Sequence, residues 1–372
     1  MTSARVESTT ATVQGTAAGK RDVAAIILAA GRSTRMKTEL PKVMHEVCGV
    51  PMLGHVLRAC REAGIERFIV VVGYAKDAIV NAFGRETGVE FVEQREQKGT
   101  GHAVMMCRDV LADFNGDVIV IAGDMPLIRG QTLRDLLGAH RATASSASIA
   151  TTVLADPTSY GRIIRNDKGD FTGIVEHRDC TPDQLKINEV NPSYYCFDAR
   201  ELMGALTDIK PNNAKGEYYI TDVLSILRGK GKAVRASTSV PAADATGINS
   251  RVDLADVNRL MQTRIQQHWM ETGVTIVDTA TTWIDSRATI GPDASIRPFS
   301  YIEGNARIGA RCIVGPYAYV GDGAVIEDGA TVGPGVLSAL DAARSASGAR
   351  GPVETRQKSQ AVRRPPAQTG IA

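Results

Sequence analysis

The sequence predicts an α/β domain with an open parallel sheet, followed by a short left-handed parallel β-helix. In the first part of the chain, apolar runs alternate with segments of helical spacing. Strands that alternate with helices form right-handed βαβ units around a parallel sheet. Later, an aliphatic residue recurs at every sixth position between Ile284 and Val332, and a small residue usually follows four places after it. A six-residue period fits neither a helix nor a flat strand, and it is typical of a triangular β-helix.

Three apolar runs define the predicted sheet. The run VAAIILAAG starts at Val23, and similar runs cover residues 68–73 and 118–124. Such runs are typical of parallel strands that are covered on both faces. Residues 52–60 have the spacing of an amphipathic helix between the first two runs. Because ligands of open parallel sheets bind at the carboxyl ends of the strands, the end of the first run is the predicted edge of a binding crevice.

The remaining patterns divide the chain into five parts. After about residue 149 the runs become shorter and hairpin turns appear, which indicates an insertion facing the substrate. The two ends are rich in small and polar residues and are expected to be disordered. The predicted parts are a leader (1–22), an α/β domain (23–250), a linker helix (251–273), a β-helix (274–337) and a basic tail (338–372).

Composition narrows the function classes. The chain has 372 residues, a formal charge of +2 and 43% hydrophobic residues, which describes an ordinary globular protein rather than one that coats nucleic acid. No run approaches the roughly 18 apolar residues that cross a bilayer. We therefore expect a cytoplasmic protein with no nucleic-acid or membrane partner.

The segment LAAGRSTRMKTELPKVMHEV leaves the first predicted strand through a glycine turn and carries Arg35, Lys37 and Lys42. Backbone amides in a tight turn can hold phosphate oxygens, and fixed cations neutralise the charge that develops during phosphoryl transfer. The spacing is neither that of a P-loop nor that of a dinucleotide fingerprint.

This segment resembles the signature loop of sugar-1-phosphate nucleotidyltransferases, L-x-x-G-x-G-T-R-M followed by L-P-K, with Ser33 in place of the second glycine. The segments EQREQKGTGHAV and AGDMPLI resemble the uracil-reading and metal-binding segments of N-acetylglucosamine-1-phosphate uridyltransferases. SYGRI, GIVEH, EVN, GEYYITD and TGINSR follow in the family's order. The resemblance covers residues 23–272 and implies a Rossmann-like nucleotidyltransferase domain.

The resemblance also implies roles for individual residues. Arg35 and Lys42 would be catalytic, through contacts with the phosphates, and Gln94 would offer its amide to the uracil edge. Asp124 and Asn249 would bind Mg²⁺, which prefers hard oxygen donors. The implied nucleotide-binding residues are Leu28, Ala29, Ala30, Gly31, Gln94, Gly99, Thr100, Ala122, Gly123 and Asp124, and the implied sugar-binding residues are Gly161, Glu176, Asn191, Tyr219, Thr221 and Asn249.

The implied reaction transfers UMP from UTP to N-acetylglucosamine 1-phosphate and releases pyrophosphate. Two alternatives stay open. The chain could be a nucleotidyltransferase for another sugar 1-phosphate, or a catalytically silent regulatory subunit with the same fold.

Enzymes that this chain resembles often carry a longer β-helix that acetylates glucosamine 1-phosphate with a histidine base. Here no histidine follows His268, and the repeat ends near Val332. We therefore expect no acetyltransferase activity and interpret the β-helix as an oligomerisation scaffold. Homotrimers are usual for this architecture, although three coils offer limited contact area.

Overall fold

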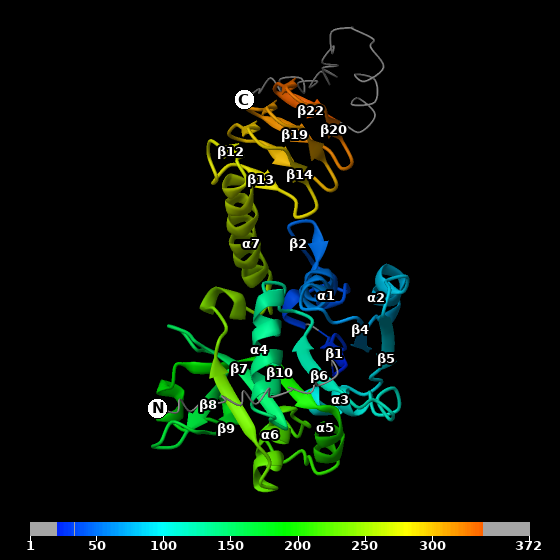
Figure 1. Ribbon diagram of the computed structural model, residues 1–372, viewed down its shortest axis with the longest axis vertical. Helices are drawn as coiled ribbons and strands as arrows, with labels where there is room; N and C mark the ends of the chain where they lie inside the picture. The colour runs from blue at the N-terminus through cyan, green and yellow to red at the C-terminus, as the bar shows by residue number, and fades with distance from the viewer. Residues whose placement is uncertain (1–20, 33, 338–372) are drawn as a thin grey trace, which may run out of the picture. The chain divides into compact units, whose positions relative to one another are not determined.

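The computed structural model describes residues 21–32 and 34–337 (Figure 1). The predicted basic tail, Ser33 and all of the predicted leader except residues 21 and 22 lie outside the described residues. The chain divides into two compact units, Met1–Val257 and Asn258–Ala372, which are described separately below.

The first unit is built on a nine-stranded sheet with the order β11-β7-β10-β6-β1-β4-β5, to which β8 and β9 are added beside β10. Its centre is parallel, because β1 pairs in parallel with both β4 and β6. Two further short strands, β2 (Glu46–Val47) and β3 (Val50–Pro51), form a separate ribbon. The strands of the large sheet are β1 (Val23–Leu28), β4 (Arg67–Val72), β5 (Val89–Glu93), β6 (Asp117–Ala122), β7 (Ala147–Val153), β8 (Gly161–Arg165), β9 (Phe171–Val175), β10 (Glu189–Asp198) and β11 (Val234–Thr238).

One strand departs from the predicted parallel sheet. Strand β10 runs antiparallel to β6 and β7, and near its start it also pairs antiparallel with β8. The reason is topological. The β8–β9 hairpin and two short 3₁₀ turns, η3 (His177–Asp179) and η4 (Gln184–Lys186), separate β7 from β10, and they bring the chain back in the reverse direction without a crossover helix.

Helices cover both faces of the sheet, which explains why its central strands are apolar throughout. Helices α1, α2 and α4 share one core with β1, and α3, α5 and α6 share the other. Alternate residues of β1 divide between these cores, since Ile27 lies in the first and Ile26 in the second. The helices are α1 (Met52–Glu62), α2 (Lys76–Phe83), α3 (Thr100–Met105), α4 (Gly130–Ala142), α5 (Ala199–Leu206) and α6 (Thr221–Gly229).

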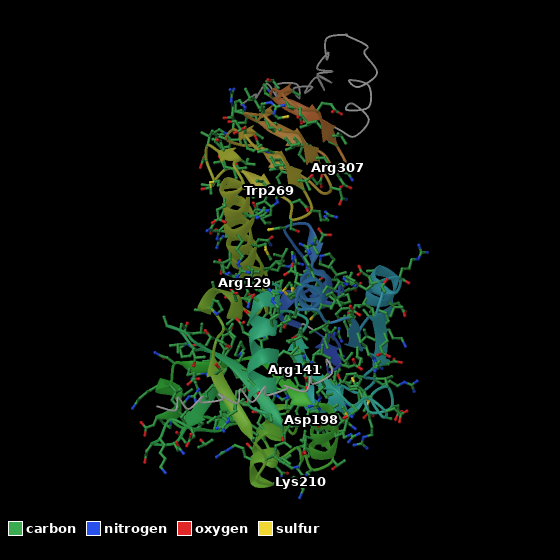
Figure 2. All side chains as sticks on the ribbon, in the orientation of Figure 1. Arg129, Arg141, Asp198, Lys210, Trp269 and Arg307 are labelled. Atoms are coloured by element: carbon green, nitrogen blue, oxygen red, sulfur yellow. The ribbon has the colours of Figure 1, made fainter. Side chains whose placement is uncertain are left out.

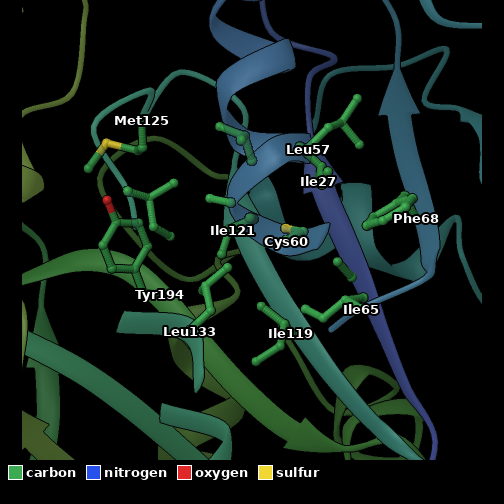
Figure 3. Packing of buried hydrophobic residues seen from close by; sticks show 14 of the residues in the cluster. Ile27, Leu57, Cys60, Ile65, Phe68, Ile119, Ile121, Met125, Leu133 and Tyr194 are labelled. Carbon is green, nitrogen blue, oxygen red and sulfur yellow. The ribbon is translucent and has the colours of Figure 1, made fainter. Parts of the chain in front are cut away.

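Figure 3 shows the first of these cores. Leu57 and Cys60 of α1 pack over Ile27 of β1 and Ile121 of β6, and all four side chains are at most 1% exposed. Burial of this kind stabilises the sheet by about 25 cal/mol for each Å² of apolar surface removed from water. The core therefore fixes the strands whose carboxyl ends carry the candidate site.

The amino-terminal edge of the central strands is held by buried charge. The Asp117 carboxylate, fully buried at the start of β6, pairs with Arg141 at 2.6 Å and with Arg21 at 3.3 Å. Arg21 also pairs with Asp198 at the end of β10. Arg141 and Asp198 are labelled in Figure 2. This cluster lies at the strand ends opposite the candidate site, so we assign it a structural role.

The second unit contains the β-helix. Three parallel sheets have the orders β12-β15-β18-β21, β13-β16-β19-β22 and β14-β17-β20. Residues eighteen apart pair in register, as Ile284 does with Ile302 and Ile302 with Val320. The strands are β12 (Thr275–Ile276), β13 (Trp283–Ile284), β14 (Thr289–Ile290), β15 (Ser295–Ile296), β16 (Tyr301–Ile302), β17 (Arg307–Ile308), β18 (Ile313–Val314), β19 (Ala318–Val320), β20 (Val325–Ile326), β21 (Thr331–Val332) and β22 (Gly335–Leu337).

Burial follows the six-residue repeat. The repeated aliphatic residues from Ile284 to Ile326 are buried in one core, and the small residues that follow them are buried as well, except Ala330, which is partly buried. Ile265 and Trp269 of helix α7 (Arg251–Glu271) pack against this core, and Trp269 is labelled in Figure 2. The predicted α/β domain followed by a short β-helix is thus confirmed. No helix in the described ranges is both long enough and apolar enough to cross a membrane.

Candidate functional site

A cavity of about 440 Å³ opens at the carboxyl ends of β1, β5 and β6, where a parallel sheet binds its ligands. The backbone closes one side of it, because the Gly123 amide donates to the Leu28 carbonyl at 2.9 Å and ties the ends of β6 and β1 together. Gly123 itself does not line the cavity. The sequence-predicted residues that do are Leu28, Ala29, Ala30, Gly31, Arg35, Lys42, Gln94, Gly99, Thr100, Ala122 and Asp124.

Two cations and two oxygen-bearing side chains meet at one end of this cavity. Lys42 Nζ forms an ion pair with Asp124 Oδ2 and donates to Asn249 Oδ1 at 2.8 Å. Arg35 Nη2 donates to the same Asn249 oxygen at 2.7 Å. The 3₁₀ turns η1 (Thr34–Met36) and η2 (Lys42–Met44) carry the two cations. The structure therefore brings together four predicted residues that are up to 214 positions apart.

The loop that carries Asn249 is anchored on both sides. The Ile248 amide donates to the Asp124 carbonyl at 3.2 Å, and the Asn249 amide donates to the Asp253 carboxylate at 2.8 Å. The Tyr160 hydroxyl, which sequence reasoning missed, donates to the Ala245 carbonyl at 2.9 Å and accepts from the Gly247 amide at 3.3 Å. These contacts set where the Asn249 side chain can reach.

The arrangement fits a magnesium ion. Asp124 Oδ2 and Asn249 Oδ1 both contact the Lys42 ammonium, so two oxygen donors already converge on one positively charged point. Mg²⁺ is commonly bound by one or two protein oxygens and completes its shell with phosphate oxygens and waters. The two side chains could therefore hold the ion once Lys42 turns to a bound phosphate.

The opposite end of the cavity is formed by side-chain amides. Gln94 is only 4% exposed, and its Nε2 donates to the Gly99 carbonyl at 3.0 Å. Gly99 has a φ of +106°, and a Cβ there would lie 2.5 Å from the Tyr218 carbonyl, so this position requires glycine. Gln97 Nε2 donates to the Ala30 carbonyl at 2.8 Å. Both side-chain amides line this end of the cavity.

None of the predicted sugar-binding residues lines the 440 Å³ cavity; Asn249 lies with Arg35 and Lys42, and the other five form a second group around Glu176. Glu176 lies beside Gly161, where an added Cβ would be 3.3 Å from its carboxylate, and it interacts with the Thr221 side chain. Burial raises the pKa of Glu176, with Asp179 and Asp222 adding to the effect. Tyr219 precedes Thr221, and burial raises its pKa to about 12.

Asn191 is the predicted sugar residue whose side chain is already occupied. Its Nδ2 donates to the Tyr195 hydroxyl at 2.6 Å, and its Oδ1 accepts from the Ser193 amide at 2.8 Å. The carboxylate of Glu176 acts on Tyr195, whose pKa is raised beyond its usual range chiefly by burial. Asn191 is therefore connected to the Glu176 group through Tyr195.

Several residues of the cavity were not predicted. Gln97 and Glu217 belong to segments that carried the resemblance, so the signal was present but had been assigned to their neighbours. Arg32, Thr34, Val43 and Ala103 follow or precede predicted residues in the sequence, and all six line the cavity. His102 contacts Gln94 at 3.0 Å and had no predicted role.

A larger hollow of about 550 Å³ lies elsewhere in the first unit, between the β8–β9 hairpin, the end of α6 and β11. It contains none of the predicted site residues, and two of its cations, Arg165 and Lys232, are already paired with Glu189 and Glu201. Size alone therefore does not identify the candidate site, and the convergence of charge and oxygen donors favours the smaller cavity.

Comparison with protein families matches both parts of the fold. Residues 25–175 match the MobA-like NTP transferase domain, and residues 287–322 and 305–337 match the bacterial transferase hexapeptide repeat. The first match contains the glycine turn, Gln94 and Asp124. The second covers most of the β-helix.

The chain is also similar over most of its length to bacterial proteins of one name. The chain is 42% identical to the bifunctional protein GlmU of Halalkalibacterium halodurans over 280 residues, which are 75% of this chain and 61% of that protein. It is 46% identical to the bifunctional protein GlmU of Mycolicibacterium vanbaalenii over 290 residues, 76% of this chain and 59% of that protein. The matched region thus spans about three fifths of these relatives.

A solved structure supports the fold alone. The crystal structure of UDP-glucose pyrophosphorylase complexed with UDP-glucose superposes with a TM-score of 0.54 at 19% identity, covering 65% of this chain and 99% of that chain.

Proposed function

We propose that the chain, which is similar to the GlmU proteins over about three fifths of their length, transfers UMP from UTP to N-acetylglucosamine 1-phosphate with release of pyrophosphate. The observation that carries the proposal is the meeting of Lys42, Arg35, Asp124 and Asn249 beside the glycine turn. Two cations and two metal-type oxygens at one end of a cavity suit a triphosphate better than any uncharged ligand.

The reaction is a displacement at phosphorus. A phosphate oxygen of the sugar 1-phosphate attacks the α-phosphorus of UTP, a new P–O bond forms, and the bond from the α-phosphorus to the bridging oxygen breaks. The electron pair leaves with pyrophosphate. Because the attacking phosphate is already an anion near neutral pH, no general base is required.

In this mechanism the protein acts by position and charge. Lys42 and Arg35 would neutralise the charge that accumulates on the departing pyrophosphate. The Lys42 side chain is only 14% exposed, so its interaction with the phosphates would be the less screened of the two, because Arg35 is exposed. The Gly31 turn lets the triphosphate approach the backbone. A magnesium ion held by Asp124 and Asn249 would add Lewis-acid polarisation of the phosphate oxygens.

Two separate groups of residues suggest which substrates are selected. The buried Gln94 amide, at one end of the cavity, would contact the edge of the base, and Glu176, which lies outside the cavity, would accept hydrogen bonds from sugar hydroxyls. The order of the sequence motifs favours uracil and N-acetylglucosamine over other bases and sugars.

The decisive experiment measures pyrophosphate release by the purified chain from UTP and N-acetylglucosamine 1-phosphate, with Mg²⁺ and with a chelator. We expect turnover that needs the metal. Parallel reactions with glucose 1-phosphate and with dTTP test the alternative substrates, and predominant turnover of either would replace our choice. No release with any sugar 1-phosphate or nucleotide would favour the silent regulatory subunit.

We further propose that residues 274–337 serve assembly rather than acetyl transfer. The segment offers no histidine as a base. Incubation with acetyl-CoA and glucosamine 1-phosphate should release no free coenzyme A, whereas steady release would overturn this part. Light scattering tests the proposed homotrimer, which would have three times the 39.6 kDa mass of one chain. A cytoplasmic location remains part of the proposal.

A further inference from the structure

The orientation of the Gln94 amide is fixed by two acceptors. Its Nε2 lies 3.0 Å from the Gly99 carbonyl oxygen and 3.0 Å from His102 Nδ1. A carbonyl oxygen can only accept, so the amide nitrogen and not the amide oxygen must face Gly99. The NH₂ group has two hydrogens, and these two partners use both of them.

The carbonyl oxygen of Gln94 is consequently the part of the amide that is left for a ligand. Gln94 lines the cavity and is itself 4% exposed. In residues 21–32 and 34–337 we find no hydrogen bond to this oxygen. A lone acceptor at the base end of the cavity selects bases by their donors. Uracil carries a hydrogen on N3, whereas the N3 of cytosine is a lone pair that an acceptor repels.

The contact from His102 requires one tautomer. To accept from Gln94, Nδ1 must carry a lone pair, which leaves the proton of a neutral imidazole on Nε2. His102 lies on α3, one turn after Gly99, so the short helix places both acceptors on the same side of the Gln94 amide.

We propose that His102 is a specificity-determining positioning residue, whose Nδ1 holds the Gln94 amide in the orientation that presents an acceptor to the base and thereby favours UTP over CTP. This inference rests on the proposed nucleotidyl transfer and adds to it the residue that sets the base preference. It assigns no contact between His102 and the substrate.

A charged imidazole would remove one of the two acceptors. Protonated His102 donates from both nitrogens, so Nδ1–H would oppose the Gln94 NH₂ group, and only the Gly99 carbonyl would then hold the amide in its orientation. The groups that face His102 are the Glu96–Lys98 ion pair and the Tyr218 ring, whose centroid is 6.2 Å away.

These surroundings keep His102 neutral near pH 7. Burial and the Lys98 charge lower the pKa of His102, against a smaller opposite effect from Glu96. The ion pair lowers the pKa of Glu96 and raises that of Lys98, so both remain charged while His102 titrates. The base preference should therefore weaken only at a pH below the ordinary range of histidine.

The test is the ratio of kcat/KM for UTP to kcat/KM for CTP, measured from about pH 8 to about pH 5 with N-acetylglucosamine 1-phosphate. The ratio cancels effects that both nucleotides share, including titration of the sugar phosphate. We compare the unaltered protein with His102→Asn, whose Oδ1 can replace the Nδ1 acceptor, and with His102→Leu, which has no acceptor. Circular dichroism checks that each variant is folded.

We expect the ratio of the unaltered protein to fall about tenfold at the acid end. His102→Asn should keep a high ratio at every pH, and His102→Leu should show a low ratio at every pH. A folded His102→Leu protein with an unchanged ratio, or the same acid loss in His102→Asn, would overturn the inference. If the unaltered protein fails to use UTP at all, the proposed function fails instead, and the two failures are therefore distinguishable.

Discussion

The β-helix and the candidate site depend on contacts of very different range. In the β-helix, Ile302 pairs with Ile284 and Val320, each eighteen residues away, and every coil repeats the same contacts. In the site, Lys42 contacts Asn249 across 207 positions and Arg35 contacts it across 214, and neither contact is part of a repeat. The β-helix is therefore stabilised by short-range contacts that every coil repeats, whereas the site depends on long-range contacts that occur once.

This difference predicts that single substitutions affect the β-helix and the site in different ways. A repeat protein distributes stability over similar units, so one altered residue weakens its own coil and the neighbouring coils. A site has no such redundancy, since one altered oxygen removes a function and leaves the core intact. The following predictions separate loss of activity from loss of stability.

The largest expected effect is on Asp124. Asp124→Asn keeps the size of the side chain but removes the charge that pairs with Lys42 and that would bind the metal. We expect kcat/KM to fall on the order of 10²–10³-fold, with an unchanged melting temperature. Pyrophosphate release and thermal unfolding measure the two quantities.

The matched control is Asp167→Asn, the same chemical change on the exposed turn between β8 and β9. It should leave kcat/KM within about twofold, because surface changes away from the site have little effect. Equal losses in the two variants would show that general charge, and not the meeting point of Lys42 and Asn249, determines activity.

The second prediction concerns the β-helix. Ile302 is fully buried in the middle coil, so Ile302→Ala should destabilise this unit by about 2–5 kcal/mol through lost burial and the cavity left behind. Calorimetry of the full chain should show a lower melting temperature for the component that corresponds to the β-helix unit. Thr289→Ala is the control, because Thr289 is exposed and directly precedes a buried isoleucine. It should change the free energy of unfolding of that component by less than about 0.5 kcal/mol.

The range of the contacts also explains how much the sequence predicted. Strands β1, β4 and β6 and the coils of the β-helix follow from periodicity, because each apolar position is determined by local geometry and burial. The reversed direction of β10 does not follow, since it depends on how β8, β9 and β10 pair after folding. No local pattern indicates its direction.

The site shows the same limit. The glycine turn with Arg35 and Lys42 has a local signal, but Asn249 resembles any turn residue and was identified only through its match to a family motif. His102 and Tyr160 were missed because their contacts are with Gln94 and with residues 245–247, and a lone histidine or tyrosine indicates neither partner. Such roles can be recognised only from contacts in the folded structure.

Tyr160 gives a third and smaller effect. Tyr160→Phe removes the hydroxyl that links the Ala245 carbonyl and the Gly247 amide, and so loosens the loop that carries Asn249. We expect the Mg²⁺ concentration for half-maximal activity to rise about tenfold, since hydrogen bonds that orient metal ligands commonly contribute that much. The KM for UTP at saturating Mg²⁺ should change little. An equal rise in the Mg²⁺ concentration for half-maximal activity and in the KM for UTP would indicate general damage to the domain.

The smallest expected effect concerns Glu176 and pH. Burial raises the pKa of Glu176, so as pH falls this carboxyl becomes protonated before an ordinary glutamic acid does. A protonated carboxyl loses acceptor capacity for sugar hydroxyls, and the KM for the sugar 1-phosphate should rise several-fold. Glu176→Gln should have a raised KM at every pH and lack this additional rise.

The phosphate of the sugar 1-phosphate also gains a proton as the pH falls, which can change the KM by itself. The Glu176→Gln variant serves to correct for this change in the substrate. Dividing the KM of the unaltered protein by that of Glu176→Gln at each pH removes the change that belongs to the substrate. A ratio that still rises with acidity places the titrating group on Glu176, and a flat ratio would exclude it. Because Glu176 does not line the cavity that holds Gln94, the KM for UTP should stay constant over the same interval.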